Sequence, residues 1–443
     1  MPSAIYSGSA VPTTRDGIIK FTNCRLVKGN SLVERDLWIS AASGKIICGQ
    51  EAFYGQHKAP STIIDLGGRM VSPGFIDVQL NGAVGFDFSV LPDDMADYSA
   101  GVQRVNEALA RTGVTSYLPT LTSQRSEVYQ KSLPLLGPSG FMRLPDHGAE
   151  SLGAHCEGPF LSVTKNGIHN VEFLQRALRG FTDLEDCYGA DNLRAWTKAY
   201  GTPESRPSPI KMITAAPEVG RITSAIPEIT SRGIVFSIGH SESTYEQASK
   251  AVEAGATMVT HLFNAMRPLH HRNPGIFGVL GEAESLPRPF FGVIADGVHL
   301  HPTCVKLAFS AHPDGFILVT DAIGLAGLED SIYEWTNGIR IVKNGALLTL
   351  EGSDKLAGSS ITLIECVSNF LNWTGATIPE AIKTVTSTPA RMLGLASMKG
   401  TLSTGADADI VVLTEDQSDP KHVKLIVDQV WKFGVKIYDR QEA

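Results

Sequence analysis

Short apolar runs alternate with helical patterns along the middle of the chain. The runs are rich in β-branched residues, and between them apolar positions recur with the spacing of one helix face. This alternation predicts βαβ units and a parallel sheet. The candidate strands between residues 71 and 321 are 71–78, 114–118, 152–156, 210–214, 234–239, 257–260, 291–295 and 316–320. Their number and span predict an α/β fold of the (β/α)₈ barrel type.

One βα unit can be followed residue by residue. The apolar run 234–239 ends at His240, and Ser243 to Glu246 (STYE) has the pattern of a capping box that starts a helix. Gly255 is placed to end that helix. The next strand ends at His261, so the pattern predicts two histidines at the carboxyl ends of two successive parallel strands.

Both ends of the chain show a different pattern. Short alternating segments separated by Gly, Asn and Ser turns predict strands at 17–27, 31–39, 44–49, 408–413, 423–430 and 435–438. We therefore expect a small β-sandwich domain built from residues 1–71 together with 395–443, and a barrel domain of residues 72–394 inserted into it. Residues 339–350 predict a hairpin that turns at Asn344-Gly345 and either extends the β domain or forms a flap.

Composition narrows the class of protein. The 443 residues are 43% hydrophobic and 19% charged, which is typical of a folded globular chain. With 38 basic and 46 acidic side chains the net charge is −8, and no basic run suits a nucleic-acid partner. No apolar stretch is long enough to span a membrane, and residues 1–20 lack a signal-peptide core. Six cysteines without a Cys-x-x-Cys pair indicate reduced thiols and a cytoplasmic location.

Four side chains at predicted strand ends can carry chemistry. Glu157, His240 and His261 supply one carboxylate and two imidazoles, a known catalytic zinc set that leaves one position open for water or substrate. A metal held this way lowers the pKa of a bound water and polarises a carbonyl. Asp321 follows another strand and can act as general base and acid, although Asp is also a favoured helix N-cap.

Other chemistries lack their signatures. His155-Cys-Glu157 matches the His-x-Glu of zinc deaminases, but the Pro-Cys-x-x-Cys partner is missing. The chain has no P-loop, no G-x-G-x-x-G and no G-x-S-x-G elbow. The basic loop 267–272 is the local cluster of positive charge, and Arg272 in it suits a small anionic substrate.

These residues in this order resemble the amidohydrolase superfamily, and within it the N-acetylglucosamine-6-phosphate deacetylases. The resemblance extends from about residue 17 to 439. The matching segments are 73–82 (PGFIDVQLNG), 117–120 (YLPT), 155–159 (HCEGP), 167–170 (GIHN), 239–241 (GHS), 260–266 (THLFNAM), 295–299 (ADGVH), 319–322 (VTDA) and 356–360 (LAGSS). An insertion between Ser162 and Pro209 is longer than in the bacterial form and suggests a eukaryotic-type enzyme.

The resemblance implies a role for each matching residue. It implies Glu157, His240 and His261 as metal ligands and Asp321 as the catalytic acid and base. The implied substrate contacts are His169, Asn264, Ala265, Arg272, His299, Leu356, Ala357 and Gly358. Many superfamily members carry His-x-His on the first strand for a second metal, where this chain has Gln79 and Asn81, so one divalent metal, expected to be Zn²⁺, is the better prediction.

The expected reaction is hydrolytic deacetylation of N-acetyl-D-glucosamine 6-phosphate to D-glucosamine 6-phosphate and acetate, in a homodimer. Asp321 takes a proton from the attacking water and returns it to the leaving amine, while Arg272 and His299 hold the phosphate. A cyclic-amide hydrolase would need the first-strand His-x-His and a bridging lysine. A barrel scaffold without catalysis would lack a ligand or the base, and all four residues are present.

Overall fold

The computed structural model describes residues 5–6, 17–195, 208–281, 287–334, 340–416, 418–419 and 422–442. Most of the polar N-terminal stretch and residues 196–207 of the insertion lie outside the described residues.

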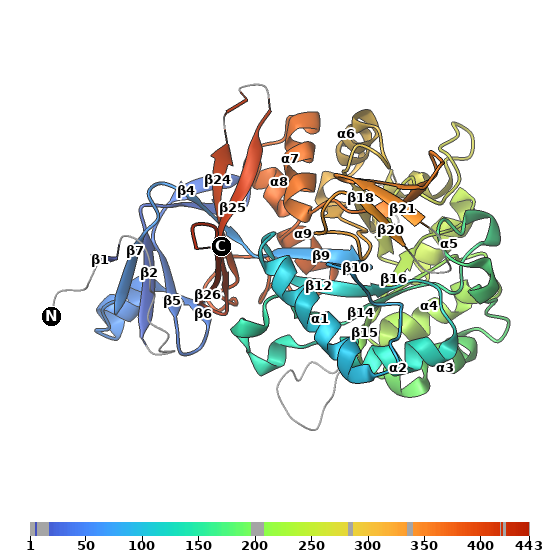
Figure 1. The fold of residues 1–443 in the computed structure, drawn as a ribbon, viewed down its shortest axis with the longest axis horizontal. Coiled ribbons are helices and arrows are strands. Elements are labelled where there is room, and N and C mark those ends of the chain that lie inside the picture. Colours follow the sequence, from blue (N-terminus) through green and yellow to red (C-terminus); the bar gives the residue numbers. More distant parts are fainter. Residues whose placement is uncertain are drawn as a thin grey trace.

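Parallel strands with helices around them form the larger part of the molecule, to the right in Figure 1, and the strands are hydrogen-bonded in the order of a ring. In ring order the strands are β9 (Phe75–Leu80), β12 (Val114–Leu121), β14 (Ala154–Glu157), β15 (Ile210–Ala215), β16 (Val235–Ile238), β17 (Met258–Val259), β18 (Phe290–Ile294) and β19 (Phe316–Val319), and β13 (Glu150–Ser151) pairs with β12 at its outer side. The Asp321 amide donates to the Gln79 carbonyl at 2.9 Å and joins the last strand to the first. The predicted barrel is confirmed.

Helices follow the strands and cover the outside of the ring. They are α1 (Met95–Ala110), α2 (Ser126–Leu136), α3 (Phe181–Tyr188), α4 (Ile222–Ser231), α5 (Tyr245–Glu253), α6 (Pro302–Ala311), α7 (Leu363–Thr374), α8 (Ile378–Lys383) and α9 (Ser387–Met392). Their buried faces pack on the strands in one apolar core. No helix in the described part of the chain combines the length and the apolar character needed to cross a bilayer.

The predicted start of α5 is wrong by one residue. The capping box is formed by Thr244 and Gln247, not by Ser243 and Glu246. The Ser243 hydroxyl is not free to cap the helix because it donates to the Glu218 carboxylate at 2.8 Å.

Strands from both ends of the chain form two further sheets beside the barrel (Figure 1). One contains β1 (Ile5–Tyr6), β7 (Thr62–Asp65), β2 (Ile18–Thr22), β5 (Leu37–Ser40) and β6 (Lys45–Ile47). The other contains β26 (Val435–Asp439), β25 (Lys424–Lys432), β24 (Ile410–Asp416), β8 (Met70–Pro73), β3 (Arg25–Lys28) and β4 (Ser31–Glu34). Phe21 and Trp431 meet edge-to-face at 4.9 Å in the core that these strands share. A small β domain is therefore present, and its exact division from the barrel at residues 71/72 and 394/395 stays a prediction.

The first predicted barrel strand divides into two parts. β8 pairs with β24 in the terminal sheet, and β9 pairs with β12 in the barrel. Gly74 lies between them, where a Cβ atom would come within 2.0 Å of the Thr115 hydroxyl. This close approach lets one extended segment pass from one sheet to the other.

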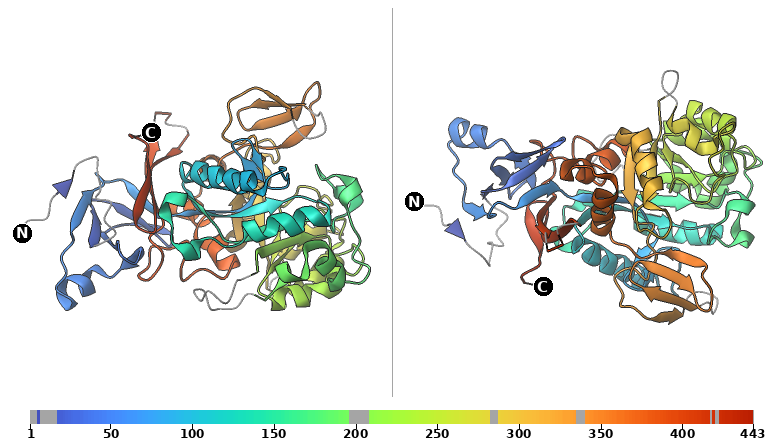
Figure 2. Two further views of the ribbon diagram at one scale, coloured as in Figure 1. Left: turned by 60° about the horizontal axis from the view of Figure 1, so that its bottom comes forward. Right: turned by 90° about the horizontal axis from the view of Figure 1, so that it is seen from above.

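A four-stranded sheet projects from the barrel (Figure 2). It contains β20 (Ile332–Glu334), β21 (Arg340–Asn344), β22 (Leu347–Leu350) and β23 (Leu356–Ser359). The hairpin is present, but Asn344 pairs with Leu347, so it turns at Gly345-Ala346, one residue later than predicted. The short pair β10 (Gly82–Ala83) and β11 (Phe86–Asp87) lies after β9. Of the two alternatives for residues 339–350, the flap is right, because β21 pairs with β20 and β22 and not with the terminal sheets.

A buried ion-pair cluster joins the barrel to the terminal strands. Glu150 of β13 and Asp409 share the ammonium groups of Lys399 and Lys432, and Lys399 also contacts Asp407 at 2.9 Å. The three carboxylates lie close enough to hold a metal ion, but each already pairs with a cationic side chain, and Asp407 also pairs with Lys45 and Arg143.

The positive charges in this cluster lower the pKa values of two of its carboxyl groups. Burial acts to raise the pKa values of Asp407 and Asp409, but Lys399 outweighs it and holds both below their usual range. A carboxylate with a lowered folded-state pKa stabilises the protein above about pH 4 and loses this effect as the pH falls through the folded-state pKa.

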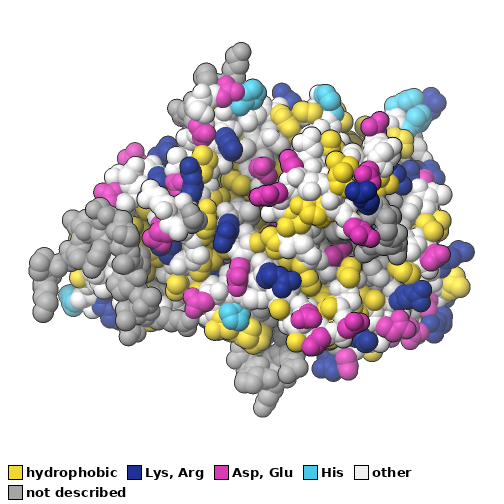
Figure 3. Space-filling model, in the orientation of Figure 1, with side chains coloured by type: hydrophobic (Ala, Val, Ile, Leu, Met, Phe, Trp, Pro, Cys, Tyr) yellow, Lys and Arg dark blue, Asp and Glu magenta, His cyan; other side chains and the backbone are white. Residues whose placement is uncertain are grey.

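On the surface of the molecule, exposed acidic and basic side chains are interspersed on the face shown in Figure 3.

Replacing Lys399 tests the cluster. We expect Lys399→Met to lower the free energy of unfolding at pH 7 by about 3–5 kcal/mol, because buried carboxylates lose a counter-charge. We also expect its stability to fall less steeply below about pH 4 than that of the parent. Urea unfolding at several pH values measures both. The control is Lys383→Met, whose pair with Asp314 at 3.0 Å is exposed and is worth less than about 1 kcal/mol; equal losses in the two variants would contradict the assignment.

Candidate metal centre

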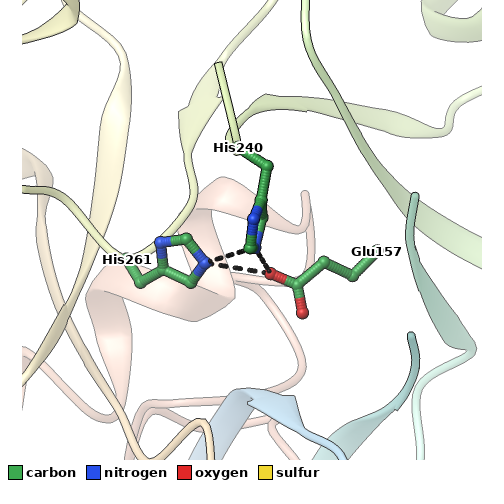
Figure 4. A group of neighbouring side chains, drawn as sticks. All are labelled: Glu157, His240 and His261. Atoms are coloured by element: carbon green, nitrogen blue, oxygen red, sulfur yellow. Dashed lines mark hydrogen bonds and ion pairs between the residues drawn. The ribbon is translucent and has the colours of Figure 1, made fainter. Parts of the chain in front are cut away.

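Three side chains from separate strands converge at the carboxyl end of the barrel (Figure 4). Glu157 is the last residue of β14, and His240 and His261 each follow the end of a strand by two residues. Glu157 Oε1 lies 3.1 Å from His240 Nε2 and 3.0 Å from His261 Nε2, and the two nitrogens are 2.9 Å apart. All three side chains are almost completely buried.

The donor atoms fit a metal ion. Ligands about 2.0–2.1 Å from a tetrahedral Zn²⁺ lie about 3.3–3.4 Å from one another, close to the separations found here. His240 Nδ1 donates to the Lys165 carbonyl at 2.7 Å, which leaves the Nε2 lone pair facing the centre. His261 Nδ1 is buried and lacks a hydrogen-bond partner among the described residues.

The electrostatics of the three groups are coupled. Burial acts to raise the pKa of Glu157, but hydrogen bonds with His240 and His261 outweigh it and hold the pKa well below its usual value. Burial acts to lower the pKa of His261, whereas the hydrogen bond and charge of Glu157 raise it to about 9. The pocket therefore favours positive charge next to Glu157, and a cation bound there would displace a proton.

The backbone around the centre is strained. The φ angles of His240, His261 and Asp321 are +49°, +24° and +47°, in a region that residues with a Cβ rarely adopt. Such conformations cost about 1–3 kcal/mol each and persist where the surrounding contacts enforce them. The positions of the strand ends are therefore not enough to orient these side chains. Contacts from the surroundings must also hold the loops after the strands in these backbone conformations.

Gln79 and Asn81 act as hydrogen-bond donors to the site. Gln79 Nε2 donates to Glu157 Oε1 at 3.0 Å, and Asn81 Nδ2 donates to Asp321 Oδ1 at 2.7 Å. Each amide holds a carboxylate at the position where a second pair of imidazoles would otherwise bind metal.

Asp321 is half-buried, and its carboxyl group accepts a hydrogen bond from Asn81. Burial and the charge of Glu157 raise its pKa to about 7, while the charges of His261 and His299 and the Asn81 hydrogen bond act in the opposite direction. A carboxyl group with a pKa near neutrality can both accept and return a proton at physiological pH.

His169 is held as a neutral hydrogen-bond donor. Its Nδ1 accepts the Ser123 backbone amide at 3.0 Å, so the ring proton is on Nε2. Burial and the nearby His240 lower the pKa of His169 to about 3, which keeps the ring neutral. Its ring centre is 4.5 Å from that of His240, beside the three donor atoms.

The other expected substrate contacts lie on loops around this centre. Asn264 and Ala265 follow His261, and the Asn264 amide nitrogen is buried without a partner in the described structure. Residues 356–358 lie on β23, which is joined to the barrel by the Ile323 amide donating to the Ser359 carbonyl at 3.0 Å. Arg272 is exposed. Of the expected substrate contacts, His169 lies against His240, and Arg272 is the one on a fully exposed loop position.

His299 is oriented by a residue that sequence reasoning left without a role. Asp296 Oδ2 accepts from His299 Nδ1 at 2.6 Å, and Asp296 Oδ1 accepts the backbone amides of Val298 and His299. The sequence signal that could have indicated this role is an Asp at a predicted strand end, three residues before a His. Ser123 and the Lys165 carbonyl were also missed, because neither residue type nor spacing marks them.

Comparisons with known proteins agree with this geometry. The pattern of the amidohydrolase family matches residues 70–435. A Homo sapiens protein named N-acetylglucosamine-6-phosphate deacetylase is 40% identical over 409 residues, covering 90% of this chain and 92% of its own.

Two solved structures are similar over nearly the whole chain. The N-acetylglucosamine-6-phosphate deacetylase of Pasteurella multocida has a TM-score of 0.76 at 26% identity and covers 95% of this chain and 99% of its own. A mutant of the Mycobacterium smegmatis deacetylase in complex with N-acetyl-D-glucosamine 6-phosphate has a TM-score of 0.72 at 26% identity, with the same coverage.

Proposed function

This chain belongs to the amidohydrolase family, among the N-acetylglucosamine-6-phosphate deacetylases, and we propose that Glu157, His240 and His261 bind one metal ion while Asp321 moves the proton. The reaction is hydrolysis of N-acetyl-D-glucosamine 6-phosphate to D-glucosamine 6-phosphate and acetate. The observation that supports this assignment of residues is the convergence of three donor atoms within about 3 Å, with the nearby charge of Glu157 acting on Asp321.

The donor set supports a single Zn²⁺. One carboxylate oxygen and two imidazole nitrogens match a catalytic zinc site with an open position. Gln79 and Asn81 argue against a second ion, because their amide groups already donate to Glu157 and Asp321. A metal ion bound here would lower the pKa of a water molecule and polarise the acetamido carbonyl.

Asp321 serves as base and then as acid. Asn81 fixes Oδ1 of its carboxyl group, which leaves Oδ2 to accept a proton from the water that attacks the amide carbon. When the C–N bond breaks, the same oxygen returns that proton to the amine nitrogen, so that glucosamine 6-phosphate and acetate leave.

His169 binds the carbonyl oxygen of the acetamido group. Its neutral ring donates through Nε2, because Nδ1 accepts from Ser123. A donor fixed in this way stabilises the negative charge that develops on the oxygen without reorganising during the reaction. Asn264, Ala265, His299 and residues 356–358 line the sugar site.

Arg272 binds the phosphate, and the enzyme works as a homodimer. Arg272 is exposed, so its guanidinium is accessible to an anionic group. Around the same mouth, exposed apolar side chains lie on the segment after β14 and on the basic loop. They are Val163, Ile168, Val171, Leu178 and Leu269. These residues support a subunit contact next to the phosphate site.

The cysteines support a cytoplasmic location. All six are free thiols, which suits a reducing compartment.

Substrate and chelator test the proposed chemistry together. We expect purified protein to release acetate from N-acetylglucosamine 6-phosphate, to lose this activity after dialysis against a chelator and to regain it with one equivalent of Zn²⁺ per chain. Acetate release is measured by a coupled assay, and bound metal by elemental analysis. Full activity in metal-free protein would refute the metal assignment.

Asp321→Asn isolates proton transfer. We expect kcat to fall by about 10²–10⁴-fold, since the amide cannot accept the proton, with Zn²⁺ content unchanged. Steady-state kinetics and elemental analysis are the measurements, and turnover within a few-fold of the parent would exclude Asp321 as the base.

Arg272→Ala isolates phosphate binding. We expect KM for the phosphorylated sugar to rise about 10-fold or more through loss of a charge-assisted contact, with a smaller effect on kcat. The matched substrate is N-acetylglucosamine without phosphate, whose kcat/KM should not change. Equal losses for both substrates would place the phosphate elsewhere.

A further inference from the structure

Glu218 makes an unusual set of contacts outside the centre just described. It lies in the loop after β15, three residues beyond the end of that strand. Its Oε2 accepts the hydroxyls of Ser241 and Ser243 at 2.7 and 2.8 Å, and its Oε1 accepts the Glu242 backbone amide at 2.6 Å. We call Glu218 and residues 241–243 the Glu218 cluster.

The cluster is not an ordinary surface ion pair. No Lys or Arg of the described structure pairs with Glu218. Its carboxylate oxygens instead accept hydrogen bonds from one short segment of the chain, residues 241–243. Ser241 and Ser243 are completely buried, and among the described residues their hydroxyls bind only this carboxylate and each other, with the Ser243 amide also donating to the Ser241 hydroxyl at 3.0 Å. A carboxylate that accepts several hydrogen bonds fixes its donors more firmly than a neutral acceptor does.

The segment that Glu218 holds follows directly after a metal-binding candidate. His240 has a φ of +49°, which needs support from its surroundings. On one side the His240 carbonyl accepts the Ser162 amide at 2.9 Å, and the Ser241 amide donates to the Ala265 carbonyl at 3.1 Å. On the other side the Glu218 cluster fixes the next three residues, so the backbone of His240 is held from both directions.

The same contacts explain why helix α5 starts late. Ser243 has the sequence pattern of an N-cap, yet its hydroxyl belongs to the Glu218 cluster and Thr244 caps the helix. The segment 241–243 is therefore kept out of the helix and available to set the direction of His240.

We propose that Glu218 is a positioning residue that holds His240 in its strained, metal-binding conformation through Ser241, Glu242 and Ser243. The inference rests on the proposed function in one respect, that His240 binds metal. Glu218 itself touches neither the metal nor the substrate, so its loss acts on metal affinity first.

Zn²⁺ affinity of Glu218→Gln tests the proposal. The variant keeps the size of the side chain but replaces an acceptor oxygen with a donor, and we expect Zn²⁺ to bind about 10–100-fold more weakly, as for other outer-shell partners of metal ligands. Metal-free full-length protein is titrated with Zn²⁺ against a chromophoric chelator. At saturating Zn²⁺ we expect KM for N-acetylglucosamine 6-phosphate within about two-fold of the parent, because the substrate contacts are intact.

Two further variants separate positioning from general stability. Glu228→Gln on α4 removes a surface carboxylate, paired with Arg232 at 2.8 Å, and should leave Zn²⁺ affinity unchanged. Ser241→Ala/Ser243→Ala should weaken Zn²⁺ binding as Glu218→Gln does, and adding Glu218→Gln to it should weaken binding by less than in the parent.

These experiments distinguish a failure of the proposed function from a failure of the proposed role of Glu218. If the parent protein fails to bind Zn²⁺, the proposed function is wrong and this inference falls with it. If the parent and Glu218→Gln bind Zn²⁺ equally well, the inference alone is overturned. This holds even if the variant has a lower melting temperature, because such a loss would show a role in stability only.

Discussion

Three electron-pair donors from distant parts of the chain are held about 3 Å apart at the mouth of the barrel, and most features of this protein follow from that arrangement. Bringing a carboxylate and two imidazoles so close in a buried place is unfavourable unless a positive charge lies between them. The lowered pKa of Glu157 and the raised pKa of His261 both show that the site favours a positive charge next to Glu157. Burial, together with the charge of Glu157, raises the pKa of the neighbouring Asp321 to about 7, which suits it to moving a proton.

Holding this arrangement requires more than a barrel. The strands bring their carboxyl ends to one face, but His240, His261 and Asp321 all lie in left-handed backbone conformations beyond the strand ends. Side chains from neighbouring loops supply the constraint: the amides of Gln79 and Asn81 bind the two carboxylates, and the Lys165 carbonyl fixes one imidazole. These hydrogen bonds orient the carboxylates and the imidazole from outside the group of three donor atoms.

The small β domain is tied to the barrel by a cluster of opposite charges rather than by apolar contacts alone. Lys399 and Lys432 lie among three buried carboxylates, so the opposite charges compensate one another within the cluster. Glu150 lies on the barrel strand β13 and Lys432 on the terminal strand β25, while the other members lie in the segment before β24, so the cluster joins the two parts of the molecule.

The amino-acid sequence by itself determined the barrel, its eight strands and the approximate ends of the strands, because burial on both faces leaves an apolar run that is visible locally. It also indicated that Glu157, His240, His261 and Asp321 would meet, since parallel strands present their carboxyl ends at one face. Only the tertiary structure decided which atoms meet: the tautomer of His169, the role of Asp296 beside His299, and the use of Ser243 by Glu218 instead of by helix α5. These depend on backbone angles and on loops that approach from far along the chain, and no local pattern of residues specifies either.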